Sequence, residues 1–132
     1  MVTKVFPGAT IVPRQEWCLD KVIWAKGKQL LIYISAPYSL GDVVTNVRFA
    51  CEVGDKILTK GHIPFVPHLT HFWHFISPKS WEEWMKIDTA IVKRCDALLR
   101  VNGKSIGADM EVTVALDAGI PVYYSLEEIP NV

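Results

Sequence analysis

The fold class is decided by residues 29–66, QLLIYISAPYSLGDVVTNVRFACEVGDKILTKGHIPFV. The stretch starts with a continuous apolar run over 29–35, which is typical of a strand buried on both faces. Apolar residues then recur at helical spacing over 43–60, with Gly61 as the stop, and a short apolar run at 63–66 predicts a second strand. A strand, a helix and a strand in this order predict a right-handed βαβ unit with parallel strands.

The rest of the chain continues the same alternation. Residues 67–78, PHLTHFWHFISP, are predicted to form a long loop, and Ser80 and Glu83 have capping-box spacing at the start of a helix. The predicted elements after the loop are a helix over 80–94, a strand over 97–101, a helix over 107–118 and a strand over 121–124. This order predicts an α/β fold, a three-layer sandwich of the Rossmann or flavodoxin-like type, in which helices flank a mostly parallel sheet of roughly four to five strands.

Length and charge limit the possible partners. The 132 residues suffice for a single domain over 1–132, with an N-terminal extension over 1–28, containing one or two extended segments, and a core over 29–126. The formal net charge is zero, which argues against a nucleic-acid polymer or an anionic membrane as the main partner. No apolar run approaches the roughly 20 residues of a membrane-spanning helix, and the N-terminus lacks the apolar core of a signal peptide.

The cysteines indicate the compartment. Their number is odd, they are widely spaced, and they stand in apolar surroundings at positions Cys18, Cys51 and Cys95. This pattern favours reduced thiols over disulfides and therefore predicts a cytoplasmic protein.

Two carboxylates are predicted to point into the protein. On the helix over 107–118, Glu111 lies at the centre of the apolar face. The apolar residues on this face or at its edges are Ala108, Val112, Val114, Ala115, Leu116 and Ala118. On the preceding helix, Asp88 lies within an apolar stripe formed by Trp84, Ile87, Ile91 and Cys95. A carboxylate without partners in such a place costs several kcal/mol, so each acid needs either a structural partner or a functional reason.

Both readings remain open from the residues alone. A structural partner could be a backbone amide or one of the arginines Arg48, Arg94 and Arg100. The functional reading is a carboxylate pair in a cleft at the carboxyl ends of the strands, an arrangement that breaks glycosidic bonds. Glu111 is predicted to lie in the first turn of its helix, where the helix dipole favours the ionised form and so a nucleophile rather than a general acid.

The start of the same helix is a candidate anion site. Ser105 and Gly107 stand at the start of the helix, where the first backbone N–H groups have no hydrogen-bond acceptor within the helix. Such groups suit a phosphate or a 5′-hydroxyl.

With these residues assembled, about residues 30–124 resemble the nucleoside 2-deoxyribosyltransferase superfamily, which includes nucleoside 5′-monophosphate N-glycosidases. The resemblance rests on the order and spacing of four motifs, which are LIYISAPY at 31–38, FVPH at 65–68, IDTAIVKRCDALL at 87–99 and SIGADMEVTVA at 105–115. The longer N-terminal segment and the short stretch after the last predicted strand depart from the family pattern.

The resemblance implies a double-displacement reaction on a nucleoside or its 5′-monophosphate, without a cofactor. Glu111 would attack C1′ of the sugar, Asp88 would hold or protonate the leaving base, and Tyr33 would orient Glu111. A second base or water would then capture the glycosyl-enzyme. Candidate substrate contacts are Ser35, Ala36, Pro37, His68, Ser105 and Gly107, and Ser105 matches a phosphate-contacting serine. The resemblance also implies a homodimer or higher homo-oligomer.

Two other functions compete with this one. A non-catalytic nucleotide-binding sensor on the same scaffold would keep Ser105 and Gly107 but would not need an ionised Glu111. A metal-dependent hydrolase could use the three histidines that recur every third residue, which are His68, His71 and His74. This spacing lacks a clear helix and an accompanying ligand pair, so no metal is predicted.

Overall fold

The structure is a computed structural model that describes residues 3–6, 9–11 and 28–132. Strands β1 (Thr3–Phe6) and β2 (Ala9–Ile11) pair antiparallel in a two-stranded sheet of their own. They agree with the extended segments expected before the core. The rest of the predicted extension, with Cys18, lies outside the described residues.

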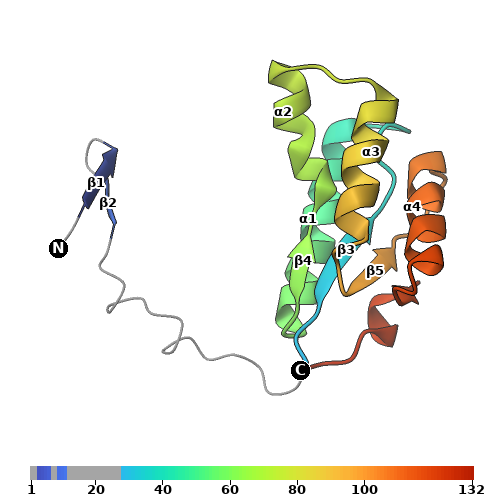
Figure 1. The fold of residues 1–132 in the computed structure, drawn as a ribbon. Coiled ribbons are helices and arrows are strands. Elements are labelled where there is room, and N and C mark those ends of the chain that lie inside the picture. Colours follow the sequence, from blue (N-terminus) through green and yellow to red (C-terminus); the bar gives the residue numbers. More distant parts are fainter. Residues whose placement is uncertain (1–2, 7–8, 12–27) are drawn as a thin grey trace.

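The main sheet is fully parallel and has the strand order β4-β3-β5-β6 (Figure 1). Its strands are β3 (Leu31–Ser35), β4 (Ile63–Phe65), β5 (Ala97–Arg100) and β6 (Val122–Tyr123). The helices are α1 (Val43–Thr59), α2 (His71–Ile76), α3 (Trp81–Val92) and α4 (Ile106–Asp117), with 3-10 turns η2 (Pro67–Thr70) and η3 (Leu126–Glu128). The predicted α/β fold class is confirmed.

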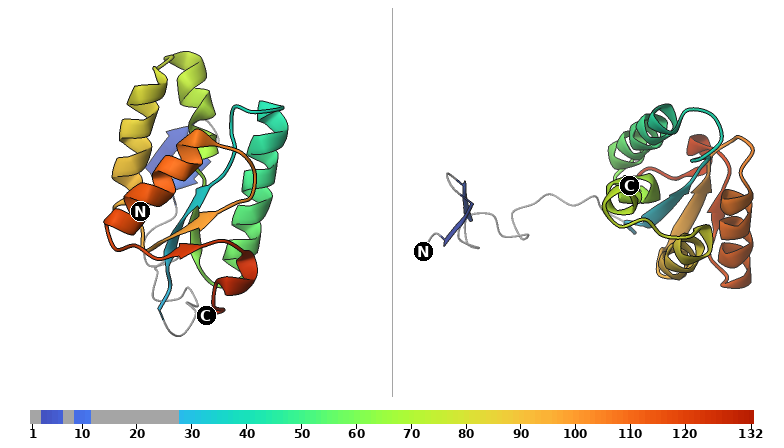
Figure 2. Two further views of the ribbon diagram at one scale, coloured as in Figure 1. Left: turned by 90° about the vertical axis from the view of Figure 1, so that its right-hand side faces the viewer. Right: turned by 90° about the horizontal axis from the view of Figure 1, so that it is seen from above.

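Alternate residues of β3 pack against opposite layers, because successive side chains of a strand point to opposite faces. Ile32 and Ile34 belong to the core on the α1 side, with Ala50, Val53 and Ile57 of that helix. Tyr33 belongs to the core on the other side, with Val92 at the end of α3, Cys95 just after it and Ala115 of α4. Figure 2 shows α1 on one face of the sheet and α3 and α4 on the other, which gives the predicted three layers.

Side-chain caps explain where the long helices begin. Asp42, Ser80 and Ser105 are the N-cap residues of α1, α3 and α4, and each side chain accepts a hydrogen bond from a backbone N–H of the first turn. The capping-box spacing at Ser80 therefore identified a true helix start. Gly61 follows α1 with φ of +92°, a conformation that glycine adopts without the steric cost of a Cβ.

The prediction of a long loop over 67–78 is wrong, because these residues form η2 and α2. The apolar residues of α2 do not follow the pattern of a helix that packs against a core, because Phe72, Phe75 and Ile76 are all exposed. The segment is also rich in histidine and aromatic residues, which have weak helix propensity.

The predicted apolar face of α4 also needs correction at its C-terminal end. Leu116 is 58% exposed, whereas Ala108 and Ala115 are buried as expected. A residue five positions after Glu111 lies about 140° around the helix from it, so Leu116 points away from the sheet. Ala118 is exposed because it stands at the C-cap of the helix.

One imidazole joins the start of β3 to the last residues of the chain. The Leu30 N–H donates to Nδ1 of His62 at 3.0 Å, and Nε2 of His62 lies 2.6 Å from the Pro130 carbonyl oxygen. Because Nδ1 accepts, the ring proton is on Nε2, which donates to Pro130. His62 is 1% exposed, and this contact lies at the end of the sheet opposite the carboxyl ends of the strands (Figure 1).

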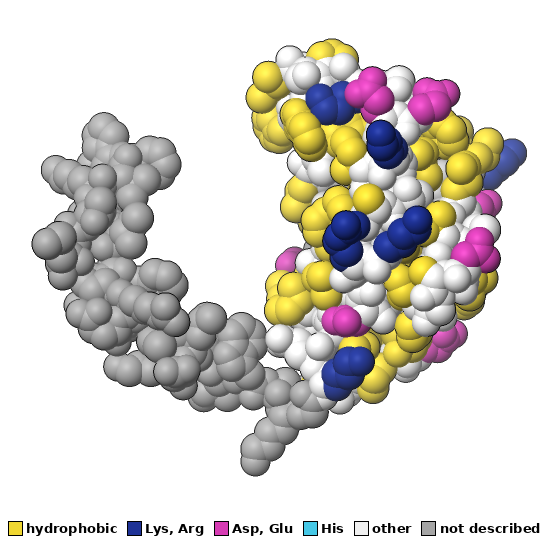
Figure 3. All heavy atoms as spheres, in the orientation of Figure 1, with side chains coloured by type: hydrophobic (Ala, Val, Ile, Leu, Met, Phe, Trp, Pro, Cys, Tyr) yellow, Lys and Arg dark blue, Asp and Glu magenta, His cyan; other side chains and the backbone are white. Residues whose placement is uncertain are grey.

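None of the helices described is long and apolar enough to cross a membrane. On the face of the described residues drawn in Figure 3, Lys and Arg side chains are interspersed with Asp, Glu and apolar side chains. That face therefore presents a mixed surface rather than one continuous basic field.

Candidate active site

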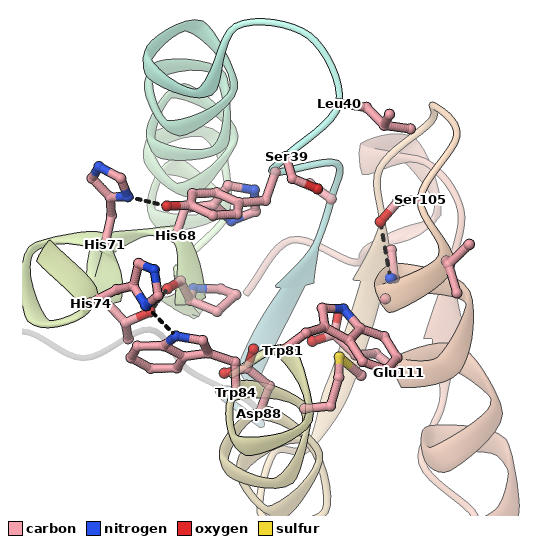
Figure 4. A pocket seen from close by; sticks show the side chains of 18 of the residues that line it. Ser39, Leu40, His68, His71, His74, Trp81, Trp84, Asp88, Ser105 and Glu111 are labelled. Atoms are coloured by element: carbon pink, nitrogen blue, oxygen red, sulfur yellow. Dashed lines mark hydrogen bonds between the residues drawn. The ribbon is translucent and has the colours of Figure 1, made fainter. Parts of the chain in front are cut away.

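A cavity of about 720 Å³ opens at the carboxyl ends of the strands. Its wall comes from the loop after β3, from η2 and α2, from α3 and from the start of α4 (Figure 4). Six of the nine predicted site residues line it, and they are Ala36, His68, Asp88, Ser105, Gly107 and Glu111. The cavity therefore brings together residues that are far apart in the sequence.

The other three predicted site residues, Tyr33, Ser35 and Pro37, are not among the residues that line the cavity. Tyr33 and Ser35 are both 0% exposed and bond to Glu111, so Ser35 supports that carboxylate and is not among the residues that line the cavity. The carbonyl oxygen of Pro37 lies 2.8 Å from Nε2 of His68. Ser35 and Pro37 thus contact other site residues in this structure, and their contacts with a substrate stay a prediction.

Glu111 is held at both carboxyl oxygens. Tyr33 donates its hydroxyl to Oε2, and the Ser35 hydroxyl donates to Oε1 at 2.8 Å. Glu111 is 6% exposed, and its burial raises the pKa of the carboxyl to about 7, against the lowering effect of the two hydroxyl donors. The carboxyl is thus preorganised and titrates near neutral pH.

Two sequence expectations about Glu111 are corrected by this geometry. Glu111 lies in the second turn of α4, because the helix already begins at Ile106. The helix dipole acts mainly on the first turn, so it does not set the charge state of this carboxyl. Burial dominates instead and moves the pKa upward.

Asp88 contributes a second, half-buried carboxyl to the same cavity. Its Oδ1 has no hydrogen-bond partner among the described residues. Burial raises the pKa of Asp88 to about 6, and the proximity of Asp88 raises the pKa of Glu111 further. The charge of Asp88 therefore acts on Glu111, and between about pH 6 and about pH 7 the two carboxyls together hold roughly one proton.

The three arginines considered as structural partners bond elsewhere. Arg48 pairs with Glu52 at 3.2 Å, Arg94 donates to the carbonyl oxygen of Ala90, and Arg100 pairs with Asp109 at 2.9 Å. Arg100 lowers the pKa of Glu111 through its charge without a direct bond. Within the described part of the chain, neither acid is part of a simple ion pair.

Sequence reasoning missed the aromatic wall of the cavity. Nδ1 of His74 accepts hydrogen bonds from Nε1 of Trp84 at 2.9 Å and from the Lys79 N–H at 3.1 Å, and Tyr38 and His71 are hydrogen bonded to each other. Trp84 lines the cavity beside His74, and Trp81 lines it on the side of Glu111 (Figure 4). The density of His and Trp over 68–84 was the signal, but α2, the helix that places His71 and His74, was not recognised.

The three histidines do not assemble a metal site. Across the residues that the structure describes, no three His, Cys, Asp or Glu side chains lie together where they could hold a metal ion. Nε2 of His68 is used by Pro37, and burial lowers the pKa of His68, so its ring is neutral at neutral pH.

The loop before α4 is fixed by close contacts. The Arg100 guanidinium donates to the carbonyl oxygens of Val101 and Gly103, and Ser105 caps α4 by accepting from the Ala108 N–H at 3.1 Å. Gly103 has φ of +124°, and a Cβ at this position would lie 2.7 Å from Cγ of Pro37. Glycine is therefore required where the two cavity loops meet.

We expect Gly103→Ala to lower the free energy of unfolding by about 2–4 kcal/mol, through backbone strain and the clash with Pro37. Urea denaturation measures this change. Gly119→Ala is the matched control, since Gly119 has φ of +74° but a Cβ added there would meet nothing within 4 Å. If both variants lost the same stability, the contact between the loops would contribute nothing.

Comparisons with known proteins support the fold. Residues 30–125 match the model of a protein family described as a domain of unknown function, DUF7768. No curated protein matches the chain. The solved structure of a 2-deoxyribosyltransferase from the psychrotolerant bacterium Bacillus psychrosaccharolyticus is similar, with a TM-score of 0.53 and 20% identity, over 70% of this chain and 69% of that chain. At this identity the similarity concerns the fold, and it supports the fold relation that the sequence motifs suggest.

Proposed function

The chain belongs to the DUF7768 family, and we propose that it cleaves or transfers the N-glycosidic bond of a nucleoside or a nucleoside 5′-monophosphate. The observation that carries the proposal is the buried Glu111 carboxyl, held at both oxygens by Tyr33 and Ser35 and facing a cavity that also contains Asp88. The fold shared with a 2-deoxyribosyltransferase supports the same chemistry.

In the first step, a lone pair of the Glu111 carboxylate forms a bond to C1′ of the sugar. The C1′–N bond breaks, and its electron pair moves to the base, which takes a proton from Asp88. In the second step, water or another base attacks C1′, and the ester bond to Glu111 breaks with its electron pair returning to the carboxylate. Asp88, now ionised, accepts the proton that the attacking group releases.

The assignment of the two roles rests on hydrogen bonds. The pKa of Glu111, about 7, lies above that of Asp88, about 6, so in the empty cavity Glu111 holds a proton part of the time. However, Tyr33 and Ser35 stand ready to stabilise an ionised Glu111, whereas Asp88 has no such donor among the described residues. The reactive form of the pair therefore has the carboxylate on Glu111 and the proton on Asp88.

The cavity suits a substrate of this class. Its volume, about 720 Å³, is in the range of ligand sites and has room for a nucleotide. Trp81 and Trp84 offer aromatic surface to a base, and His68 offers Nδ1, a buried acceptor without a partner among the described residues. Ser105 and Lys104 at the start of α4 support the 5′-monophosphate as the preferred form.

We also propose that this single-domain protein acts as a cytoplasmic homo-oligomer. Exposed apolar side chains gather on η2 and α2, at Leu69, Phe72, Phe75 and Ile76, and such surface is typical of a subunit contact. The described cysteines Cys51 and Cys95 are both free thiols, as a reducing compartment requires.

The dependence of kcat/KM on pH is expected to be bell-shaped, with its maximum between about pH 6 and about pH 7. Below this range both carboxyls are protonated and no nucleophile remains. Above it both are ionised and the base leaves without a proton. Initial rates measured to about two pH units on either side of the two pKa values would reveal both limbs. A rate that rises continuously with pH would contradict the shared proton.

Release of free base, followed by chromatography, tests the function itself. The panel contains ribo- and deoxyribonucleosides and their 5′-monophosphates, each with and without an acceptor base. Release without an acceptor identifies a hydrolase, and exchange that requires the acceptor identifies a transferase. Binding of a nucleotide without release from any member would instead favour the non-catalytic sensor.

A further inference from the structure

Ser35 is a buried hydroxyl beside Glu111 that can choose between two acceptors. Its Oγ lies 2.8 Å from Oε1 of Glu111 and 3.2 Å from the carbonyl oxygen of Ala108, one turn earlier in α4. A hydroxyl carries one proton, so it can donate to only one of these oxygens at a time. Ser35 is 0% exposed, and no solvent competes for this proton.

Tyr33 differs from Ser35 in this respect. Its hydroxyl donates to Oε2 of Glu111, and no second acceptor for it is found among the described residues. The two hydroxyls reach Glu111 from the same strand, two residues apart, because such residues share one face of β3. Oε2 of Glu111 thus has a fixed donor in Tyr33, whereas Oε1 has a donor, Ser35, that can rotate towards the carbonyl oxygen of Ala108 instead.

We propose that Oε1 is the oxygen that bonds to C1′ and that Ser35 assists its departure in the second step, an inference that rests on the proposed function. While the ester exists, Ser35 donates to the carbonyl oxygen of Ala108, and Tyr33 keeps its bond to Oε2, the carbonyl oxygen of the ester. As the C1′–Oε1 bond breaks and its electron pair moves to Oε1, the Ser35 hydroxyl turns back and stabilises the new carboxylate. The Ser35 proton only rotates and is not transferred.

The other charged or titratable groups that act on Glu111 do not provide this assistance. Asp88 of α3 and Arg100 of β5 influence its pKa through charge, and Tyr33 is occupied at Oε2. Loss of the Ser35 hydroxyl therefore leaves Oε1 without a hydrogen-bond donor when the C1′–Oε1 bond breaks in the second step. The first step is little affected, because Oε1 gives up its hydrogen bond with Ser35 as it bonds to C1′.

The inference is tested with Ser35→Ala, acting on the substrate that the wild type cleaves fastest. We expect a burst of one equivalent of base per active site, followed by turnover about tenfold slower than in the wild type. When each enzyme is measured at its own pH optimum, which corrects for the higher pKa of Glu111 without the Ser35 hydroxyl, kcat falls while kcat/KM stays within about twofold, because only the second step is slowed. Mass spectrometry of the quenched enzyme should show a sugar adduct on the peptide that contains Glu111.

Further variants separate this role from a loss of structure. Ser35→Cys nearly keeps the volume but has a weak donor, so it should behave like Ser35→Ala, whereas Ser35→Thr keeps a hydroxyl and should restore most of the turnover. Thr113→Ala removes an exposed hydroxyl of α4 that bonds to the carbonyl oxygen of Asp109, and should match the wild type.

Three other results would contradict the proposed role of Ser35. If kcat and kcat/KM fell together without a burst, Ser35 would be a structural support and its role in the second step would be overturned. Unchanged kinetics in Ser35→Ala would overturn it as well. A wild type that releases no base from any substrate would remove the proposed function, and the role of Ser35 with it.

Discussion

Replacement of Glu111 by Gln is expected to lower the rate of base release by at least about 1,000-fold, because an amide oxygen cannot form the glycosyl ester. The variant should keep its fold. The Gln side chain has the same shape, its carbonyl oxygen can accept from one of the two hydroxyls, and its amide group can donate to the other. The loss should therefore appear in kcat rather than in substrate binding.

Rates of base release and calorimetric binding of the same substrate would measure the two properties separately. Asp117→Asn provides the matched control, since Asp117 is an exposed carboxylate on the same helix. It should retain the turnover and the stability of the wild type. Turnover by Glu111→Gln at a normal rate would show that another group, or no covalent step, accounts for the activity.

Replacement of Asp88 by Asn is expected to lower kcat by about 100-fold for bases that must leave with a proton. The effect should shrink for substrates whose base is a good leaving group as an anion, because these depend less on proton donation. The pH profile should also change. With Asp88 absent, the fall in rate above about pH 7 should disappear, while the fall that follows protonation of Glu111 should remain.

A series of substrates with bases of different proton affinity would show this dependence. Glu82→Gln is a suitable control, because Glu82 is an exposed carboxylate in the first turn of the same helix. If Asp88→Asn slowed all substrates equally, Asp88 would be holding the base rather than protonating it.

Local patterns accounted for most of the fold. The apolar run that became β3, the capping serine at Ser80 and the stop at Gly61 each act within a few residues, so the sequence alone contained the signal. The inward direction of Glu111 was also a local property, read from the periodicity of one helix.

Local patterns did not reach properties that depend on distant partners, and the contact of Tyr33 with Glu111 was expected only from the family resemblance. Glu111 and Ser35 are 76 residues apart in the sequence, and nothing in either motif indicates that their side chains bond. The aromatic wall required α2, whose apolar side chains face outward and whose histidine contacts Trp84 across a turn. The charge state of Glu111 followed from burial, which a helical wheel does not measure.

The His62 contact has a practical consequence for how the protein can be attached to other objects. It holds Leu30 and Pro130 to one imidazole at the end of the sheet opposite the cavity. A bead, an electrode or a fused protein linked after Val132 would therefore be anchored on the far side from the cavity mouth, and the immobilised protein would keep that mouth turned towards the bulk solution.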